Sequence, residues 1–142
     1  MVISKMIELD PKSRLTIYEQ VVDKVRMLIS SGVIAPNEKL LSVRDMSKQL
    51  TINPNTVQKA FRELERQGYV YTVSGVGSFA ADPADIRPDE KLIAAARLKL
   101  ADEVRELRSL TGSAAKTRAI VLDVVAHIES SFGAAAAGAK GV

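Results

Sequence analysis

Apolar residues recur along the chain with two different spacings, and these spacings predict where helices and strands lie. Between Thr16 and Gly32 the apolar positions step by three or four, the period of one helix face; they are Ile17, Val21, Val25, Leu28 and Ile29. Thr16 and Glu19 have the spacing of a capping box, and Gly32 is a natural stop. The pattern predicts a helix here, followed by a turn and a short extended piece in residues 33–41.

Two further helices are expected after this piece, with a tight turn between them. Ser42 is a good cap for a short helix that carries Val43, Met46 and Leu50 on one side. After the turn at residues 51–53, Asn53 is a favourable N-cap. Pro54 suits the first helical position because a missing N–H needs no partner there. We expect this helix to run to about residue 67, with glycine 68 closing it.

The two faces of this third helix differ in character. Positions i, i+3, i+4 and i+7 are apolar and should face the core; they are Val57, Ala60, Phe61 and Leu64. The opposite face is polar and basic, with Thr56 and Gln58 flanking Asn55, Lys59, Arg62 and Arg66. Short amides at a helix N-terminus can pair with base edges in a major groove, and cations further along can reach phosphates. The alternative is that Asn and Thr only cap the helix and the cations form a solvated face.

The next segments predict a hairpin and a domain boundary. The alternating stretch "YVYTVSGVGSFAA", rich in Tyr, Val and Phe, predicts two strands that turn around residues 74–77. The stretch "DPADIRPDE" carries two prolines and four acidic residues, and we place a linker at residues 83–88. The glycines of "GVG" are interpreted as a hairpin turn, because no helix follows them as a nucleotide loop would require.

Residues 89–132 are expected to form two helices joined at Thr111-Gly112. Each helix has one apolar stripe, and the hairpin is too small to bury both stripes by itself. We therefore predict that these helices join two subunits through Ile93, Leu100, Val104, Leu107, Val121, Val124, Val125 and Ile128. Residues 133–142, "GAAAAGAKGV", are expected to form a flexible tail.

Composition narrows the classes of function. The 142 residues are 46% apolar, contain no Cys and a single His, and carry a net charge of +3. Thiolate metal sites, disulfides and a Cys nucleophile are excluded, and one His cannot build a His-rich metal site. No Ser-His-Asp set or phosphate loop is present, so we expect no enzyme, cofactor or metal. The N-terminus lacks a signal-peptide core and no run is long enough to span a membrane, which predicts a cytoplasmic protein without membrane contact.

Residues 1–82 therefore have the arrangement of a winged helix-turn-helix domain in a mainly α protein with a small β-hairpin wing. The stretch "LLSVRDMSKQLTINPNTVQKAFRELERQGYVYTVSGVGSFAA" resembles the DNA-binding domain of the GntR family of bacterial transcription regulators, and the resemblance spans roughly residues 10–82. The linker and C-terminal helical hairpin are similar to the small YtrA-like subfamily, whose two C-terminal helices dimerise. The resemblance implies that Arg44 contacts a guanine or the adjacent backbone and that Gly77 is the wing-tip glycine near a minor groove.

From the pattern and the resemblance together we expect DNA contacts from Ser42, Arg44, Asn53, Asn55, Thr56, Gln58, Lys59, Arg62, Gly75 and Gly77. Three positions depart from the family pattern. Leu41 replaces a usual proline, Pro54 stands where many relatives have an arginine, and the wing lacks the basic residues that relatives often carry. The last departure implies a weaker and more backbone-mediated groove contact.

The function predicted first is a homodimeric repressor that binds an inverted-repeat operator on double-stranded DNA. A non-sequence-specific architectural DNA binder and a helical protein-interaction module remain as alternatives. A small-molecule effector near the linker or in the dimer seam stays open, although the hairpin offers little volume. The operator, the regulated genes and the choice between repression and activation do not follow from the sequence.

Overall fold

The computed structural model of the protein describes the backbone of residues 6–140 and the side chains of residues 6–131. The chain divides into two compact units, Met1–Arg87 and Pro88–Val142. The division falls at the end of the predicted linker, and residues Pro83–Asp85 of that linker form a single 3₁₀ turn, η2.

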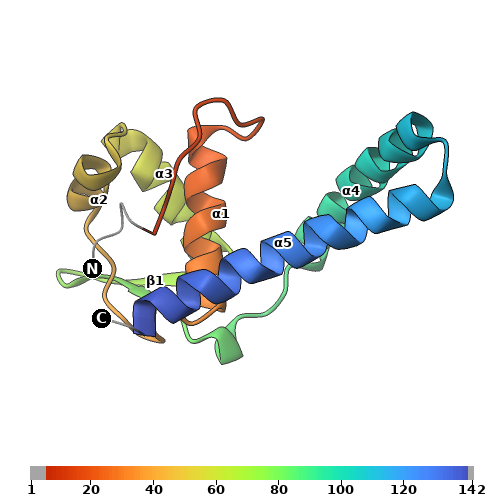
Figure 1. The fold of residues 1–142 in the computed structure, drawn as a ribbon. Helices are drawn as coiled ribbons and strands as arrows, with labels where there is room; N and C mark the ends of the chain where they lie inside the picture. The colour runs from red at the N-terminus through yellow and green to blue at the C-terminus, as the bar shows by residue number, and fades with distance from the viewer. Residues whose placement is uncertain (1–5, 141–142) are drawn as a thin grey trace. The chain divides into compact units, whose positions relative to one another are not determined.

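The first unit contains three helices followed by a two-stranded antiparallel hairpin (Figure 1). Helix α1 spans Ile17–Ser30, α2 spans Val43–Leu50 and α3 spans Pro54–Arg66. Strands β1 (Val70–Val73) and β2 (Gly77–Ala80) pair so that Val70 lies opposite Ala80. This order confirms the predicted winged helix-turn-helix arrangement and the mainly α fold class.

The predicted apolar stripes of the first unit form one core. The stripe residues of α1 and α3 are buried except for Ile17, which is half-buried, and Val21, Val25, Val57 and Leu64 have 0% exposure. Ile34, Met46 and Ala80 complete the core from the loop, α2 and the wing. Burial of each of the larger side chains stabilises the folded state by about 1.5–3 kcal/mol. The core therefore determines which face of α3 points outward.

The turn between α2 and α3 contains an unusual backbone conformation. Thr51, the C-cap of α2, has φ 56° and ψ 49°, in the left-handed region. The N–H of Ile52 donates to the carbonyl of Ser47 at 3.1 Å, which closes the end of the helix. A β-branched residue is disfavoured in this conformation, so the turn carries local strain.

The extended piece predicted before α2 pairs with the wing. The N–H of Asn37 donates to Ala80 O at 2.9 Å, Ala80 N donates to Glu38 O at 2.9 Å, and Leu40 N donates to Ser78 O at 2.8 Å. Lys39 and Phe79 thereby form an antiparallel bridge. Residues 37–40 are therefore attached to the outer edge of β2 by this isolated bridge and the hydrogen bonds beside it.

The second unit is a pair of helices, α4 (Glu90–Thr111) and α5 (Ala114–Lys140). Asp89 caps α4 by accepting hydrogen bonds from the N–H groups of Lys91 and Leu92, and Gly112 at φ 64° ends it. Among the described residues, no helix combines the length and apolar character that crossing a membrane requires.

The hairpin is predicted to end at residue 132, and helix α5 continues beyond that residue to Lys140. The continuation contains a run of alanines, residues 134–137, and alanine has the highest intrinsic helix propensity, so the backbone can propagate past Gly133. The flexibility predicted for residues 133–142 stays a prediction, and residues 141–142 lie outside the described residues.

Candidate nucleic-acid interface

The start of α3 is built by its cap. The side-chain oxygen of Asn53 accepts a hydrogen bond from the N–H of Asn55 at 2.9 Å, and Pro54 occupies the first turn. The Asn53 oxygen is therefore used in capping, while the side chain stays at the surface. The N–H groups of the first turn leave the positive end of the helix dipole at the surface, where a phosphate is favoured.

The face of α3 opposite the core lies in solvent. Asn55, Gln58, Lys59 and Arg62 are exposed, and Thr56 is half-buried at the edge of the face. We call these five residues the polar face of α3. The structure thus brings together the side chains that the sequence placed on one side of this helix.

Lys59 is held in place by a residue of α1. Its Nζ lies 4.5 Å from the centre of the Tyr18 ring, a cation–π contact. Burial raises the pKa of the Tyr18 hydroxyl, and the nearby Glu63 carboxylate raises it further. The Tyr18 side chain therefore stays neutral in the physiological range.

The C-terminal half of α3 is tied to α1 by a polar network. Glu63 accepts from Arg66 at 2.6 and 2.9 Å and from Gln67 at 2.7 Å, and Arg26 of α1 donates to Gln67 at 2.9 Å. Hydrogen bonds from Arg66 and Gln67 lower the pKa of Glu63 to about 2. Arg66, which the sequence placed on the polar side of α3, is therefore engaged with Glu63.

Helix α2 contributes Ser42 and Arg44. The Ser42 hydroxyl accepts from the N–H of Asp45 at 3.1 Å and donates to the Asp45 carboxylate at 2.9 Å, so it caps the helix as predicted. Arg44 lies in the first turn of α2 with its side chain exposed. The Ser47 hydroxyl donates to the backbone carbonyl of Arg44 at 2.8 Å. This bond and the Ser42 cap do not involve the Arg44 guanidinium.

The wing turns at residues 74–76, and its two glycines have backbone conformations that side chains disfavour. Gly75 has φ 76° and Gly77 has φ 145°. The rings of Tyr71 and Phe79 stack across the strands at 5.5 Å, and the Tyr71 hydroxyl donates to the side chain of Asn37 at 2.9 Å. The wing is thus braced against residues 37–40.

The candidate interface consists of α3 with its exposed polar face, the capped helix α2 that precedes it in the chain, and the wing formed by β1 and β2. The combination suits a duplex: α3 has the width for a major groove, and the wing can approach the adjacent backbone. Among the described residues, no three His, Cys, Asp or Glu side chains gather as metal ligands would. The exposed polar side chains of α3 therefore offer surface contacts to a polyanion.

Comparison with known proteins identifies the class. Residues 17–79 match the bacterial regulatory proteins of the gntR family. The "HTH-type transcriptional repressor YtrA" of Bacillus subtilis is 42% identical over 79 residues, which cover 56% of this chain and 61% of that protein. The matched part is therefore about three fifths of that relative's length.

Two solved structures match over most of their length. A "Transcriptional Antiterminator from Listeria monocytogenes EGD-e" is 37% identical, with a TM-score of 0.74, covering 85% of this chain and 90% of that one. A "GntR family transcriptional regulator from Listeria monocytogenes" is 31% identical, with a TM-score of 0.59, covering 81% of this chain and 98% of that one. The chain is thus a winged helix-turn-helix regulator by class. It belongs to the GntR family of bacterial regulatory proteins, a family of regulators and not of enzymes.

Sequence reasoning missed three residues that shape this interface: Tyr18, Glu63 and Lys39. Tyr18 and Lys59 come from different helices, and no local spacing predicts their contact. Glu63 and Arg66 have the i, i+3 spacing of a helix pair, which is a signal that was available. The link through Gln67 to Arg26 depends on how α1 packs against α3.

Proposed function

We propose that this chain is a sequence-specific, DNA-binding transcriptional repressor that acts in the cytoplasm as a homodimer. The observation that carries the proposal is the polar face of α3, which is exposed while the opposite stripe of the same helix is buried. Membership of a family of bacterial regulatory proteins supports the same function. The repressor named YtrA, 42% identical in the matched region, supports repression as the outcome.

In this proposal α3 enters the major groove with its N-terminal residues nearest the bases. Asn55 and Gln58 can pair with an adenine edge, and Thr56 can meet a phosphate or a thymine methyl. Lys59 and Arg62 lie further along the helix and would neutralise phosphates. Arg44 would reach a guanine or the backbone beside it, and the wing would approach the minor groove through Gly75 and Gly77.

The second unit supports the homodimer because it leaves its apolar stripes uncovered within one chain. Leu100 is 59% exposed, Val124 50% and Val125 46%. Thr117 is the one buried side chain among the described residues of this unit, at the turn between the helices. Apolar surface of this extent is typical of an interface, and a second copy of the hairpin would bury it.

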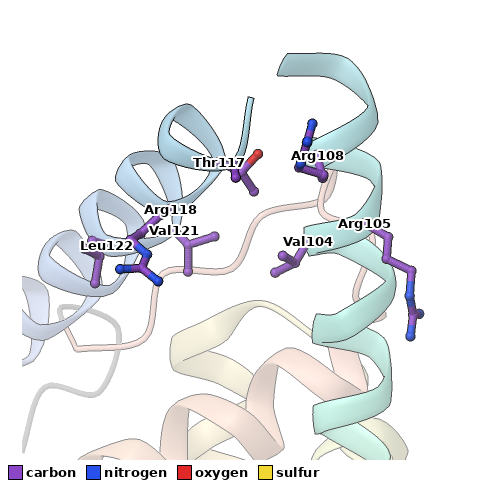
Figure 2. A pocket seen from close by; sticks show the side chains of 8 residues that line it. Val104, Arg105, Arg108, Thr117, Arg118, Val121 and Leu122 are labelled. Carbon is purple, nitrogen blue, oxygen red and sulfur yellow. The ribbon is translucent and has the colours of Figure 1, made fainter. Parts of the chain in front are cut away.

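An open groove between α4 and α5 is part of this surface. It has a volume of about 470 Å³, and Figure 2 shows Val104 of α4 and Val121 of α5 pointing toward each other across it. Arg105, Arg108 and Arg118 also line the groove. We propose that the partner's hairpin fills it, with acidic residues of α4 such as Glu103 and Glu106 near these arginines. A small-molecule effector is the other occupant that its size allows.

Selection of bound sequences from random duplexes by the purified protein tests the proposal. The expected result is an inverted repeat whose half-sites lie about one helical turn, ~10 base pairs, apart, because a two-fold symmetric dimer favours that spacing. Tight binding with no sequence preference at physiological salt would instead support the architectural alternative. Absence of duplex binding would instead support the alternative function, a helical protein-interaction module.

A further inference from the structure

The wing strands contain no charge of their own. Residues 70–80, "VYTVSGVGSFA", include no Lys, Arg, Asp or Glu. A wing that approaches a DNA backbone gains most of its affinity from cations that neutralise phosphates. The structure places such a cation beside the wing from another segment.

That cation is Lys39, in the segment of residues 37–40 that is bonded to the outer edge of β2. Its backbone is fixed opposite Phe79 by the bridge to β2, with hydrogen bonds on either side of it. Residues directly opposite each other in an antiparallel pair project from the same face of the sheet, and residues two apart share that face. Lys39, Phe79 and Gly77 therefore project from one face of the wing.

The Lys39 side chain leans along this face onto Gly77. A Cβ built at Gly77 would lie 2.9 Å from Lys39 Cε and 3.8 Å from its Nζ. The absence of a side chain at Gly77 thus leaves the space through which the end of the Lys39 side chain passes. Lys39 is exposed, so its ammonium remains accessible to a partner from solution.

We propose that Lys39 is the phosphate-binding cation of the wing. When Gly77 approaches the duplex, the Lys39 ammonium meets the phosphate beside it and supplies the positive charge that the wing sequence lacks. The inference rests on the proposed function and deepens it, since it assigns a DNA contact to a residue outside the helix-turn-helix and outside the wing strands. The wing contact is then electrostatic as well as backbone-mediated.

The test measures affinity for the selected operator duplex as a function of salt concentration. Lys39→Gln should lower the slope of log K against log salt by about one unit and weaken binding about three- to tenfold near 150 mM salt. Lys39→Arg keeps the charge and should retain both values. Lys24→Gln, in the middle of α1, removes the same charge from an element with no predicted DNA contact and should leave the slope unchanged.

A double-mutant cycle with Gly77→Ala separates this role from a general charge effect. A methyl group at residue 77 would displace the Lys39 side chain, so Lys39→Gln should cost less than about twofold in that background. Thermal unfolding of each variant shows whether it is folded. An unchanged slope for folded Lys39→Gln, or the same loss in both backgrounds, would overturn the inference. If the unmodified protein shows no sequence preference, the proposed function itself has failed.

Discussion

The ammonium of Lys59 lies 4.5 Å from the centre of the Tyr18 ring and links α3 to the start of α1. An aromatic face attracts a cation without neutralising it, and at exposed sites the attraction is worth about 0.5–1 kcal/mol. Lys59 thus has a restricted position before any partner arrives. Restriction of this kind reduces the entropy lost when the side chain meets a phosphate.

Replacing the Tyr18 ring should therefore weaken binding through Lys59. Tyr18→Leu keeps an apolar side chain against the core but removes the ring face, and we expect operator affinity to fall about two- to fivefold. Tyr18→Phe keeps the ring and is the control, with affinity unchanged. Fluorescence anisotropy with a labelled duplex measures both. Equal affinities for the two variants would mean that α3 alone positions Lys59.

Arg44 and Lys59 should differ in what their loss does to specificity. Arg44→Ala should cost about 1–3 kcal/mol on the operator and relax the preference at one base position. Lys59→Ala should weaken all duplexes alike and lower the salt slope by about one unit. Repeating the sequence selection with each variant distinguishes the two. An intact base preference after Arg44→Ala would remove Arg44 from the residues that contact bases.

Glu63 makes the stability of the first unit depend on pH. Its pKa is lowered from 4.5 to about 2 in the folded protein, first by the hydrogen bond from Arg66 and then by that from Gln67. The stabilisation is fully present above about pH 4.5 and is lost as the pH falls toward 2. Glu63→Gln should lower the free energy of unfolding by about 1 kcal/mol at pH 7, since the pair is partly solvated.

Denaturant unfolding at pH 7 and near pH 2 checks this expectation. The difference between Glu63→Gln and the unmodified protein should shrink near pH 2, because the carboxyl group is protonated in the unfolded chain and about half protonated in the folded one. Glu65→Gln removes the same charge from an exposed neighbour on α3 and is the matched control. A deficit of Glu63→Gln that is as large near pH 2 as at pH 7 would show that the lost stability does not come from the charge of Glu63.

The left-handed Thr51 offers a stabilising substitution. At φ 56° a threonine is strained and a glycine is not, so Thr51→Gly should raise the free energy of unfolding by about 0.5–1 kcal/mol. The same change at Lys48, inside α2, should lower it by about 1 kcal/mol, because glycine is unfavourable within a helix. Thermal unfolding of both variants measures these two changes in stability. A lower melting temperature for Thr51→Gly would mean that the Thr51 side chain contributes more than its strain costs.

A charge on the apolar stripe of α5 should separate the proposed dimer. Val125→Glu places a carboxylate where the partner's hairpin would pack, and we expect the mass in solution to halve and operator affinity to fall about 100-fold, as two linked sites become independent. Ser130→Glu adds the same charge to the opposite side of α5 and should leave the dimer intact. Light scattering gives the mass. A dimer that survives Val125→Glu would place the subunit contact elsewhere.

Much of the fold follows from patterns that act over a few residues. The spacing of Val57, Ala60, Phe61 and Leu64 determines which side of α3 is buried, and hence which side can meet a duplex. Asn53 and Pro54 determine where that helix starts, since cap and first-turn preferences are local. For the same reason the hairpin around residues 74–77 could be predicted from alternation and glycine alone.

The features that complete the candidate interface depend on contacts between segments far apart in the chain. Tyr18 meets Lys59 only because α1 packs against α3, and Lys39 reaches Gly77 only because residues 37–40 pair with β2. No periodicity encodes such pairs, because each residue satisfies its local pattern equally well without the other. The sequence by itself determined the helices, their buried faces and the polar side of α3. The tertiary structure alone decided which neighbouring side chains hold the cations in place.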